Sequence, residues 1–198
     1  MLKKIETLDN VGNIVIVDNG STYPPLLDWY STKPCEIIYQ SNIGHLAPWN
    51  IGLVNKLSSK HYVVTDPDLN LDHLPDDTLD FLDDILKQLK LAKLSLGLVH
   101  NDIPKDSPYY AMLRTKYKTL YDTSKTTNGV YLDVPGDTTF AMYSSNIPFV
   151  GGSSTMTPYM AKHLPWYMTD ISRKNDEEFS FYLAHANKSC SYKEFLKL

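Results

Sequence analysis

The first half of the chain alternates between β-branched apolar runs and polar segments, and this pattern predicts strands. Residues 13–17 read NIVIV, a continuous run typical of a strand buried on both faces, and the polar sequence DNGST follows. Shorter runs at 36–40 (EIIYQ) and 61–65 (HYVVT) predict two more strands. Between the first two runs, Pro24 and Pro25 stand where a helix can begin.

Helical spacing is clearest in an apolar stripe with a period of about 3.6 residues. The stripe consists of Leu79, Leu82, Ile85, Leu86 and Leu89. Asp76 and Asp77 precede it and suit a helix N-terminus, because carboxylates complement the positive end of the helix dipole. Residues 50–58 (NIGLVNKLS) favour a further helix. Strands that alternate with helices predict an α/β fold with a mostly parallel, mixed central sheet flanked by helices.

The second half of the chain has a less regular pattern. Apolar runs predict three strands, at 94–100, 129–134 and 138–143. Residues 151–167 are rich in Gly, Ser, Thr and Pro, which predicts a loop, and residues 175–189 predict a C-terminal helix. Because no repeat or interdomain linker interrupts the chain, we expect one domain over residues 1–198.

Composition and charge restrict the class of protein. With 198 residues, 42% of them apolar and 21% charged, the chain is typical of one globular domain. A net charge of −4 argues against a nucleic-acid partner, because such proteins carry a basic surface for the phosphates. The two cysteines form no CxxC pair, which favours a reducing, cytoplasmic location. No apolar run is long enough for a transmembrane segment, so we expect any membrane contact to be peripheral.

Acidic and amide side chains follow the predicted strands. Asp66 and Asp68 come directly after the strand at 61–65, and Asp18 and Asn42 follow the two earlier strands. Loops at the carboxyl ends of strands in an open α/β sheet converge on one crevice, so we expect these side chains to lie together.

The pair Asp66 and Asp68 has three readings. It can form a turn, cap a helix, or hold Mg²⁺ or Mn²⁺, since hard cations prefer oxygen ligands and often bind through one or two carboxylates plus a phosphate. The sequence DNGST likewise fits a hairpin turn, although the Pro-Pro-Leu-Leu that follows does not alternate like a returning strand.

The order of these motifs resembles that of one family. VDNGST is followed by N-x-G-x-x-x-x-x-N-x-G, formed by Asn42, Gly44, Asn50 and Gly52, and then by a strand that ends in Asp-x-Asp. This ordered set resembles the nucleotide-sugar half of GT-A glycosyltransferases, particularly those similar to family 2. The longer strings DNGSTYPPLLDWY, SNIGHLAPWN, YVVTDPDL, DTTFAMY and KHLPWY further resemble a group of small bacterial and viral glycosyltransferases. The resemblance extends from about residue 13 to residue 192.

The resemblance implies a fold and a reaction. In a GT-A domain, residues up to about 95 would serve the nucleotide sugar and residues 96–198 the acceptor. The protein would be a metal-dependent glycosyltransferase that moves a sugar from a UDP- or GDP-sugar to a hydroxyl group of a carbohydrate. Members of the family begin with a further strand and helix before the strand that ends in Asp18, and only MLKKIETLDNVG stands there. We therefore expect the first strand of the family to be missing.

Individual residues take their expected roles from the same resemblance. Asp18 is similar to the acidic residue that contacts the nucleoside, and Asp66 and Asp68 are similar to the pair that holds Mn²⁺ or Mg²⁺ and the donor diphosphate. His185 is a candidate third metal ligand, with packing on its helix face as the alternative. The expected nucleotide-sugar contacts come from Asp18, Asn19, Asn42, Gly44, Asp66, Asp68 and His163.

An acidic general base is expected near the acceptor if the reaction inverts the anomeric centre. Glu178 and Glu177, at the start of the C-terminal helix, are the first candidates, and Asp137 is the alternative. Acidic residues at a helix N-terminus also have a purely structural explanation in the helix dipole. Trp166 and Tyr167 have two readings as well, since they can stack on a sugar ring or fill the core.

Two other functions compete with glycosyl transfer. A non-catalytic module that binds a nucleotide sugar or a carbohydrate needs the same pocket, and the missing first strand favours this alternative. A nucleotidyltransferase shares the sheet and the metal but usually needs a Gly-rich loop with Lys or Arg after its first strand, and this chain shows none.

Overall fold

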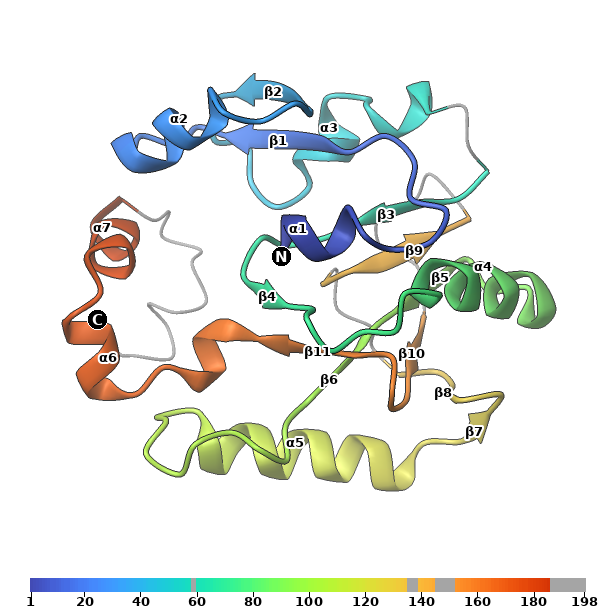
Figure 1. The fold of residues 1–198 in the computed structure, drawn as a ribbon. Coiled ribbons are helices and arrows are strands. Elements are labelled where there is room, and N and C mark those ends of the chain that lie inside the picture. Colours follow the sequence, from blue (N-terminus) through green and yellow to red (C-terminus); the bar gives the residue numbers. More distant parts are fainter. Residues whose placement is uncertain (58–59, 135–138, 145–151, 186–198) are drawn as a thin grey trace.

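Short strands form three sheets in the computed structural model of the protein, which describes residues 1–57, 60–134, 139–144 and 152–185 (Figure 1). Helices pack around these sheets, so the described residues form the mixed α/β fold that the sequence predicts. None of the described helices combines the length and the apolar character that crossing a membrane requires.

The first sheet consists of two parallel strands, β1 (Val15–Asn19) and β2 (Glu36–Gln40). Helix α2 (Pro24–Tyr30) connects them and begins at the two prolines, whose fixed φ suits a first helical turn. Two short helices, α3 (Ala47–Asn50) and η1 (Val54–Lys56), replace the single longer helix predicted after β2. Because a helix joins β1 to a parallel neighbour, DNGST does not form a hairpin turn.

The second sheet orders its six described strands as β3, β9, β5, β10, β8 and β7. Their bounds are β3 (Tyr62–Val64), β9 (Ala141–Tyr143), β5 (Lys93–Ser95), β10 (Ser153–Thr155), β8 (Val130–Tyr131) and β7 (Thr126–Thr127). Among these neighbours β5 and β10 run parallel, and all other pairs are antiparallel. The prediction of a mostly parallel sheet is therefore wrong. That prediction was based on the alternation of strands and helices in the first half of the chain. Strand β9 comes from the second half, lies between β3 and β5, and is antiparallel to both.

The third sheet joins β4 (Leu69–Asn70), β11 (Met160–His163) and β6 (Gly97–Leu98), with β11 in the middle. Strand β11 is antiparallel to β4 and parallel to β6. The prediction of a loop over residues 151–167 is wrong, since β10 and β11 both lie there. Strand β10 gives no apolar signal because its three buried side chains are serine and threonine.

The remaining helices are α1 (Leu2–Ile5), α4 (Thr78–Leu89), α5 (Tyr110–Thr123), η2 (Leu164–Tyr167), α6 (Asp170–Lys174) and α7 (Glu177–His185). Helix α4 confirms the predicted apolar stripe, and its residues Leu82, Ile85 and Leu86 are buried. Helix α7 confirms the predicted C-terminal helix as far as residue 185. Helix α5 was not predicted, because polar residues separate its buried side chains, Leu113, Tyr117 and Tyr121.

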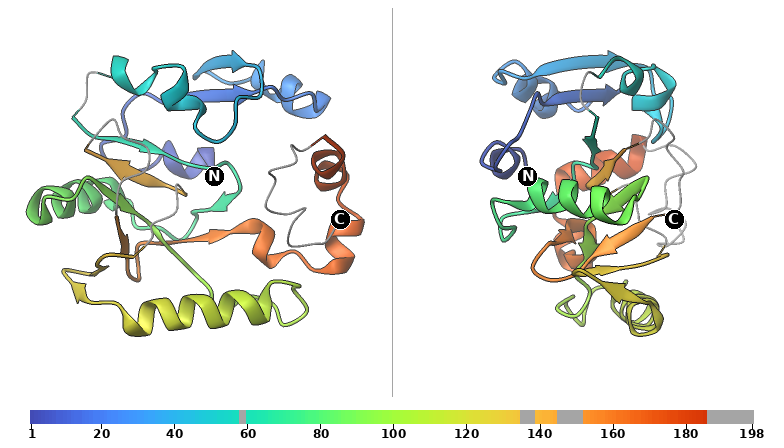
Figure 2. Two further views of the ribbon diagram at one scale, coloured as in Figure 1. Left: turned by 180° about the vertical axis from the view of Figure 1, so that it is seen from behind. Right: turned by 90° about the vertical axis from the view of Figure 1, so that its right-hand side faces the viewer.

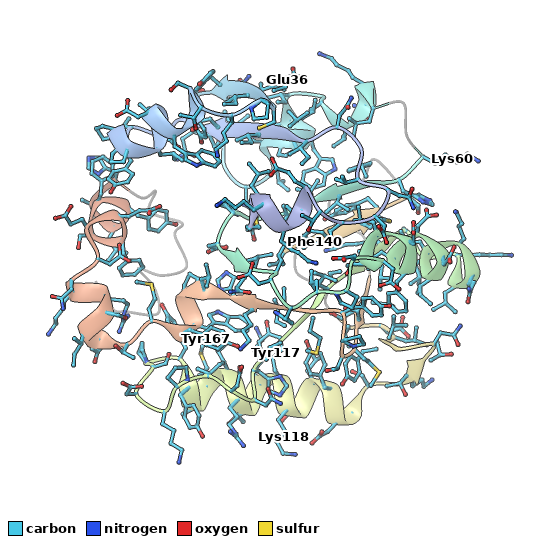
Figure 3. The ribbon with its side chains drawn as sticks, in the orientation of Figure 1. Glu36, Lys60, Tyr117, Lys118, Phe140 and Tyr167 are labelled. Atoms are coloured by element: carbon cyan, nitrogen blue, oxygen red, sulfur yellow. The ribbon has the colours of Figure 1, made fainter. Side chains whose placement is uncertain are left out.

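The hydrophobic core lies between α4, the second and third sheets, and α5. Figure 3 shows Phe140 and Tyr117 within this core, whereas Lys60 and Lys118 point outward at the periphery. Figure 2 shows from two further sides that the β1–β2 pair lies at one end of the molecule and α5 at the other.

The β1–β2 pair stands apart from the core. No described residue from 9 to 62 belongs to the buried core cluster or packs against it. The apolar side chains of β1, Val15, Ile16 and Val17, are only half-buried, so the prediction of a strand buried on both faces is wrong. In the described parts of the chain β1 pairs with β2 alone, and β3 pairs with β9 alone.

Candidate functional site

Strands β1 and β3 end on the same side of the molecule, and α7 lies on that side as well (Figures 1 and 2). The ring of Tyr23, just before α2, lies 5.1 Å from the ring of Phe181 in α7, measured between centroids. The loops that follow β1 and β3 therefore lie at the same end of the fold as α7. A site formed by both halves of the chain requires such an arrangement.

Asp18 lies near the end of β1, and its carboxylate holds the following turn. The backbone N–H groups of Gly20 and Ser21 donate to Oδ1 over 3.1 and 3.0 Å, and the hydroxyl of Tyr30 donates to Oδ2 over 2.8 Å. The residue is only 4% exposed. Burial raises the pKa of this carboxyl, but the hydrogen bonds outweigh burial, so the net pKa lies below its ordinary value. Both oxygens thus serve the fold, and the nucleoside contact of Asp18 stays a prediction.

Replacing Asp18 by asparagine is expected to lower the free energy of unfolding by roughly 1.5–3 kcal/mol at neutral pH, the usual contribution of hydrogen bonds to a charged group. Because the pKa is lower in the folded state, this contribution is complete above the unfolded-state value of about 4. It is lost as the pH falls through the lower folded-state value. Urea denaturation at pH 7, 5 and 3 measures this increment, which Asp18→Asn should lack.

The matched control is Tyr30→Phe, which removes one donor and keeps the carboxylate. This variant should lose about 1 kcal/mol and keep part of the pH dependence. If Asp18→Asn lost as much stability on acidification as the wild type, the charged turn would not be the cause.

Asn19, Asn42 and Gly44 join the loops that follow β1 and β2. The side chain of Asn19 accepts from the backbone N–H of Ile43 over 2.9 Å and donates to the carbonyl of Gly44 over 3.0 Å. Asn42 accepts from the N–H of Gly44 over 3.2 Å. A Cβ atom on Gly20 would lie 2.9 Å from the backbone nitrogen of Asn42, and Gly20 has a φ of +85°. The loops that follow β1 and β2 therefore lie together, and this close approach requires glycine at position 20. The predicted convergence of these loops with Asp66 and Asp68 stays a prediction.

Asp66 and Asp68 lie in the short connection between β3 and β4, and both are half-buried. The hydroxyl of Thr139, a buried residue just before β9, lies 3.4 Å from Oδ2 of Asp66. This contact was not predicted, although Thr139 belongs to the string DTTFAMY on which the family resemblance partly rests. The chain bends at Pro67, between the two carboxylates, and this bend is compatible with a ligand site.

His163 ends β11 and reaches the carboxylate pair from the other half of the chain. Its Nε2 atom lies 3.4 Å from Oδ2 of Asp68. The pairing of β11 with β4 positions it, because His163 stands opposite Leu69 and the N–H of Leu164 donates to the carbonyl of Asp68 over 2.9 Å. The ring of Trp166 lies 5.0 Å from the imidazole. The structure thus brings together two of the predicted donor-site residues, Asp68 and His163.

The residues around Asp68 have suitable chemistry for a divalent cation but do not form a complete coordination shell. Two carboxylates and an imidazole fit Mn²⁺, and carboxylates alone fit Mg²⁺. Within the described ranges no group of three histidine, cysteine or acidic side chains is arranged to hold a metal. His185, the predicted third ligand, lies exposed at the end of α7, where its Nδ1 atom is 2.8 Å from the carbonyl oxygen of Phe181.

The candidate general bases belong to other segments of the chain than the carboxylate pair. Glu177 and Glu178 are exposed in the first turn of α7, where they also complement the helix dipole. Asp137 lies outside the described residues. Trp166 is only 8% exposed and belongs to the core cluster, so the core reading is correct for it, and Tyr167 is half-buried beside the core.

Comparison with models of protein families, with curated proteins and with solved structures found no match to this chain. Its function must therefore be inferred from its own residues and their geometry.

Proposed function

We propose that this protein is a cytoplasmic GT-A glycosyltransferase that moves a sugar from a UDP- or GDP-sugar to a hydroxyl group of a carbohydrate. The observation that carries the proposal is the contact between His163 and Asp68 at the carboxyl side of β3. The pairing of β4 with β11 creates this contact between residues from the two halves of the chain. The loops that follow β1 and β2 support it, because hydrogen bonds join them at the carboxyl ends of two parallel strands.

Asp66 and Asp68 are the residues proposed to hold Mn²⁺ or Mg²⁺, with His163 replacing His185 as the neighbouring imidazole. Two protein carboxylates are enough for such an ion when phosphate oxygens and water complete its shell, which agrees with the incomplete protein shell. When bound, the ion would offset the negative charge that develops on the departing diphosphate. Thr139 would keep the carboxylate of Asp66 in place through its hydroxyl.

The protein side chains then have separate roles. The loops of Asn19, Asn42 and Gly44 would line the donor pocket, and the Asp18 turn would hold those loops in position. A carboxylate on the acceptor side, Glu178 or Asp137, would take the proton of the attacking hydroxyl. His163 would orient Asp68, since an imidazole within reach of a carboxylate restricts its rotation.

A non-catalytic binding module is the second candidate, and the partial burial of β1 favours it. The apolar side chains of that strand are half-buried and lie outside the core cluster. The core therefore does little to hold in place the part of the chain proposed to bind the nucleotide. Turnover separates the two functions, because an enzyme hydrolyses its donor slowly without an acceptor and a binding module does not.

Titration calorimetry with UDP and with GDP, each with and without Mn²⁺, tests the proposed site. We expect one of the two nucleotides to bind measurably only when Mn²⁺ is present, because the carboxylate pair repels a bare diphosphate. Hydrolysis of the corresponding glucose and galactose donors should accompany this binding. Equal affinity with and without the metal would overturn the metal-bridged site, and metal-dependent binding without any hydrolysis would favour the binding module.

A further inference from the structure

The dipeptide Asn-Gly occurs twice in the chain, as Asn19–Gly20 and as Asn128–Gly129. Asparagine before glycine is prone to spontaneous deamidation, because glycine has no side chain to hinder attack by its backbone nitrogen. That nitrogen attacks Cγ of the asparagine, its proton leaves with the side-chain nitrogen as ammonia, and a succinimide ring forms. Water then opens the ring at either carbonyl, which gives aspartate or isoaspartate. Since the reaction needs only water, the conformation of each dipeptide determines where it occurs.

Hydrogen bonds hold both reacting groups of the first dipeptide. The backbone N–H of Gly20 donates to the carboxylate of Asp18 over 3.1 Å, and this neighbouring negative charge disfavours loss of the proton. The side chain of Asn19 accepts from the N–H of Ile43 over 2.9 Å and donates to the carbonyl of Gly44 over 3.0 Å. Rotation of the Asn19 side chain towards Gly20 would break both of these bonds. Attack therefore requires the two loops to separate first.

Asn128 and Gly129 form the two-residue turn between β7 and β8, and both are exposed. Their φ angles are 48° and 77°, as a type I′ hairpin turn requires. The side-chain amide of Asn128 donates to Oε1 of Gln88 over 3.3 Å at an exposed position. The carbonyl of Gly129 accepts from the N–H of Met156 over 2.8 Å. An asparagine in the left-handed conformation holds the next backbone nitrogen away from its own Cγ, so attack here also requires a local opening.

The two openings differ in the contacts that they must break. Strand β7 lies at one edge of the described second sheet and pairs with β8 at two positions. Strand β1 pairs with β2 at five positions, and the side chain of Asn19 also joins the loops that follow both strands. An edge pairing as short as that of β7 is marginally stable, so we expect it to open more often than the β1–β2 connection.

We propose that Asn128 is the asparagine at which this protein deamidates spontaneously, whereas the folded state protects Asn19. This modification site does not depend on the proposed glycosyl transfer. Aspartate at position 128 no longer donates to Gln88. Isoaspartate adds a methylene group to the backbone of a turn whose strand pairing depends on its length, so β7 should separate from β8. The amide of Asn19, which joins the candidate donor loops, stays intact.

Incubation of the folded protein at mildly alkaline pH, followed by peptide mapping with mass spectrometry, measures deamidation at each asparagine. The peptide that contains Asn128 should react about tenfold faster, or more, than the peptide that contains Asn19, because opening is rarer at Asn19. Chromatography should resolve two products of equal mass, which contain aspartate and isoaspartate. In protein unfolded by urea the two rates should be similar, since both dipeptides then lack a fixed conformation.

Two variants separate the causes. Asn128→Gln should remove the fast reaction, because attack on glutamine requires a larger ring and is much slower. Asp18→Asn should speed deamidation at Asn19 and leave the rate at Asn128 unchanged, because it weakens the turn that holds Gly20. Equal rates at Asn19 and Asn128 in the folded protein would overturn the proposal. Faster reaction at Asn19 or at any other asparagine would do the same, as would a folded protein in which Asn128 does not react.

Discussion

Removing both carboxylates, in the variant Asp66→Ala with Asp68→Ala, is expected to weaken Mn²⁺-dependent binding of UDP or GDP by about 100-fold or more. Loss of residues that merely support a metal ligand already costs about 10–100-fold in metal affinity, and these two residues are the proposed ligands themselves. Asp66 and Asp68 are half-buried in a connection between two strands and do not belong to the core cluster. Replacing them should therefore leave the packing of the core intact. Calorimetry with and without the metal measures the effect, and cooperative thermal unfolding of the variant shows that the fold persists.

The control for this variant must remove the same charge elsewhere. Asp84→Ala with Asp106→Ala does so at two exposed positions, and this protein should bind the nucleotide like the wild type. His163→Ala should weaken metal-dependent binding and His185→Ala should not, because His163 lies 3.4 Å from Asp68 whereas His185 lies 2.8 Å from the carbonyl oxygen of Phe181. If the double variant at Asp66 and Asp68 melted without cooperativity, the turn would be structural and the metal reading would fail.

Loss of the proposed general base is the second large effect that we expect. Glu178→Gln is expected to reduce kcat by roughly two to four orders of magnitude, because proton transfer by a positioned carboxylate contributes about that much. Donor affinity should hardly change. Helix α7, whose first turn contains Glu177 and Glu178, lies on the side of the molecule where β1 and β3 end (Figure 1). The measurement is kcat on one acceptor, with donor affinity determined in parallel.

Glu177→Gln and Asp137→Asn complete this series. A purely structural role at the start of α7 predicts a loss of only about 0.3–1 kcal/mol in stability for each glutamate variant, with kcat nearly unchanged. That result for both glutamates would discard them as bases. If kcat then collapsed in Asp137→Asn alone, the base would belong to the segment before β9.

Local patterns predicted the elements whose side chains are apolar and regularly spaced. Helix α4 is the best example, since Leu82, Ile85 and Leu86 are buried as their spacing indicates. Strand β10 was missed because serine and threonine fill it, and these residues satisfy their hydroxyls inside the sheet, as when Thr155 accepts from the N–H of Gly97. The parallel or antiparallel direction of the strands in the six-stranded sheet was also predicted wrongly, because strand pairing depends on residues far apart in sequence.

The candidate site likewise contains motifs that the sequence predicts and contacts that it does not predict. The motifs around Asp18, Asn42 and Asp66 could be read from the sequence because each follows a recognisable strand. Their internal contacts could not, and Asp18 proved to be bound by its own turn and by Tyr30. The proximity of His163 to Asp68 depends on the ladder between β4 and β11, which no local pattern encodes.

The separation of the β1–β2 pair from the core has a consequence for local unfolding. A layer with half-buried apolar side chains outside the core cluster is expected to open at a lower free energy than the helices and strands around the core. Its amide hydrogens should therefore exchange with solvent sooner than those of α4 or β5. A nucleotide sugar bound between this layer and Asp68 would contact both parts at once, so part of its binding energy would be used to restrict this motion. Under the proposed function, binding of the donor should therefore slow amide exchange in β1.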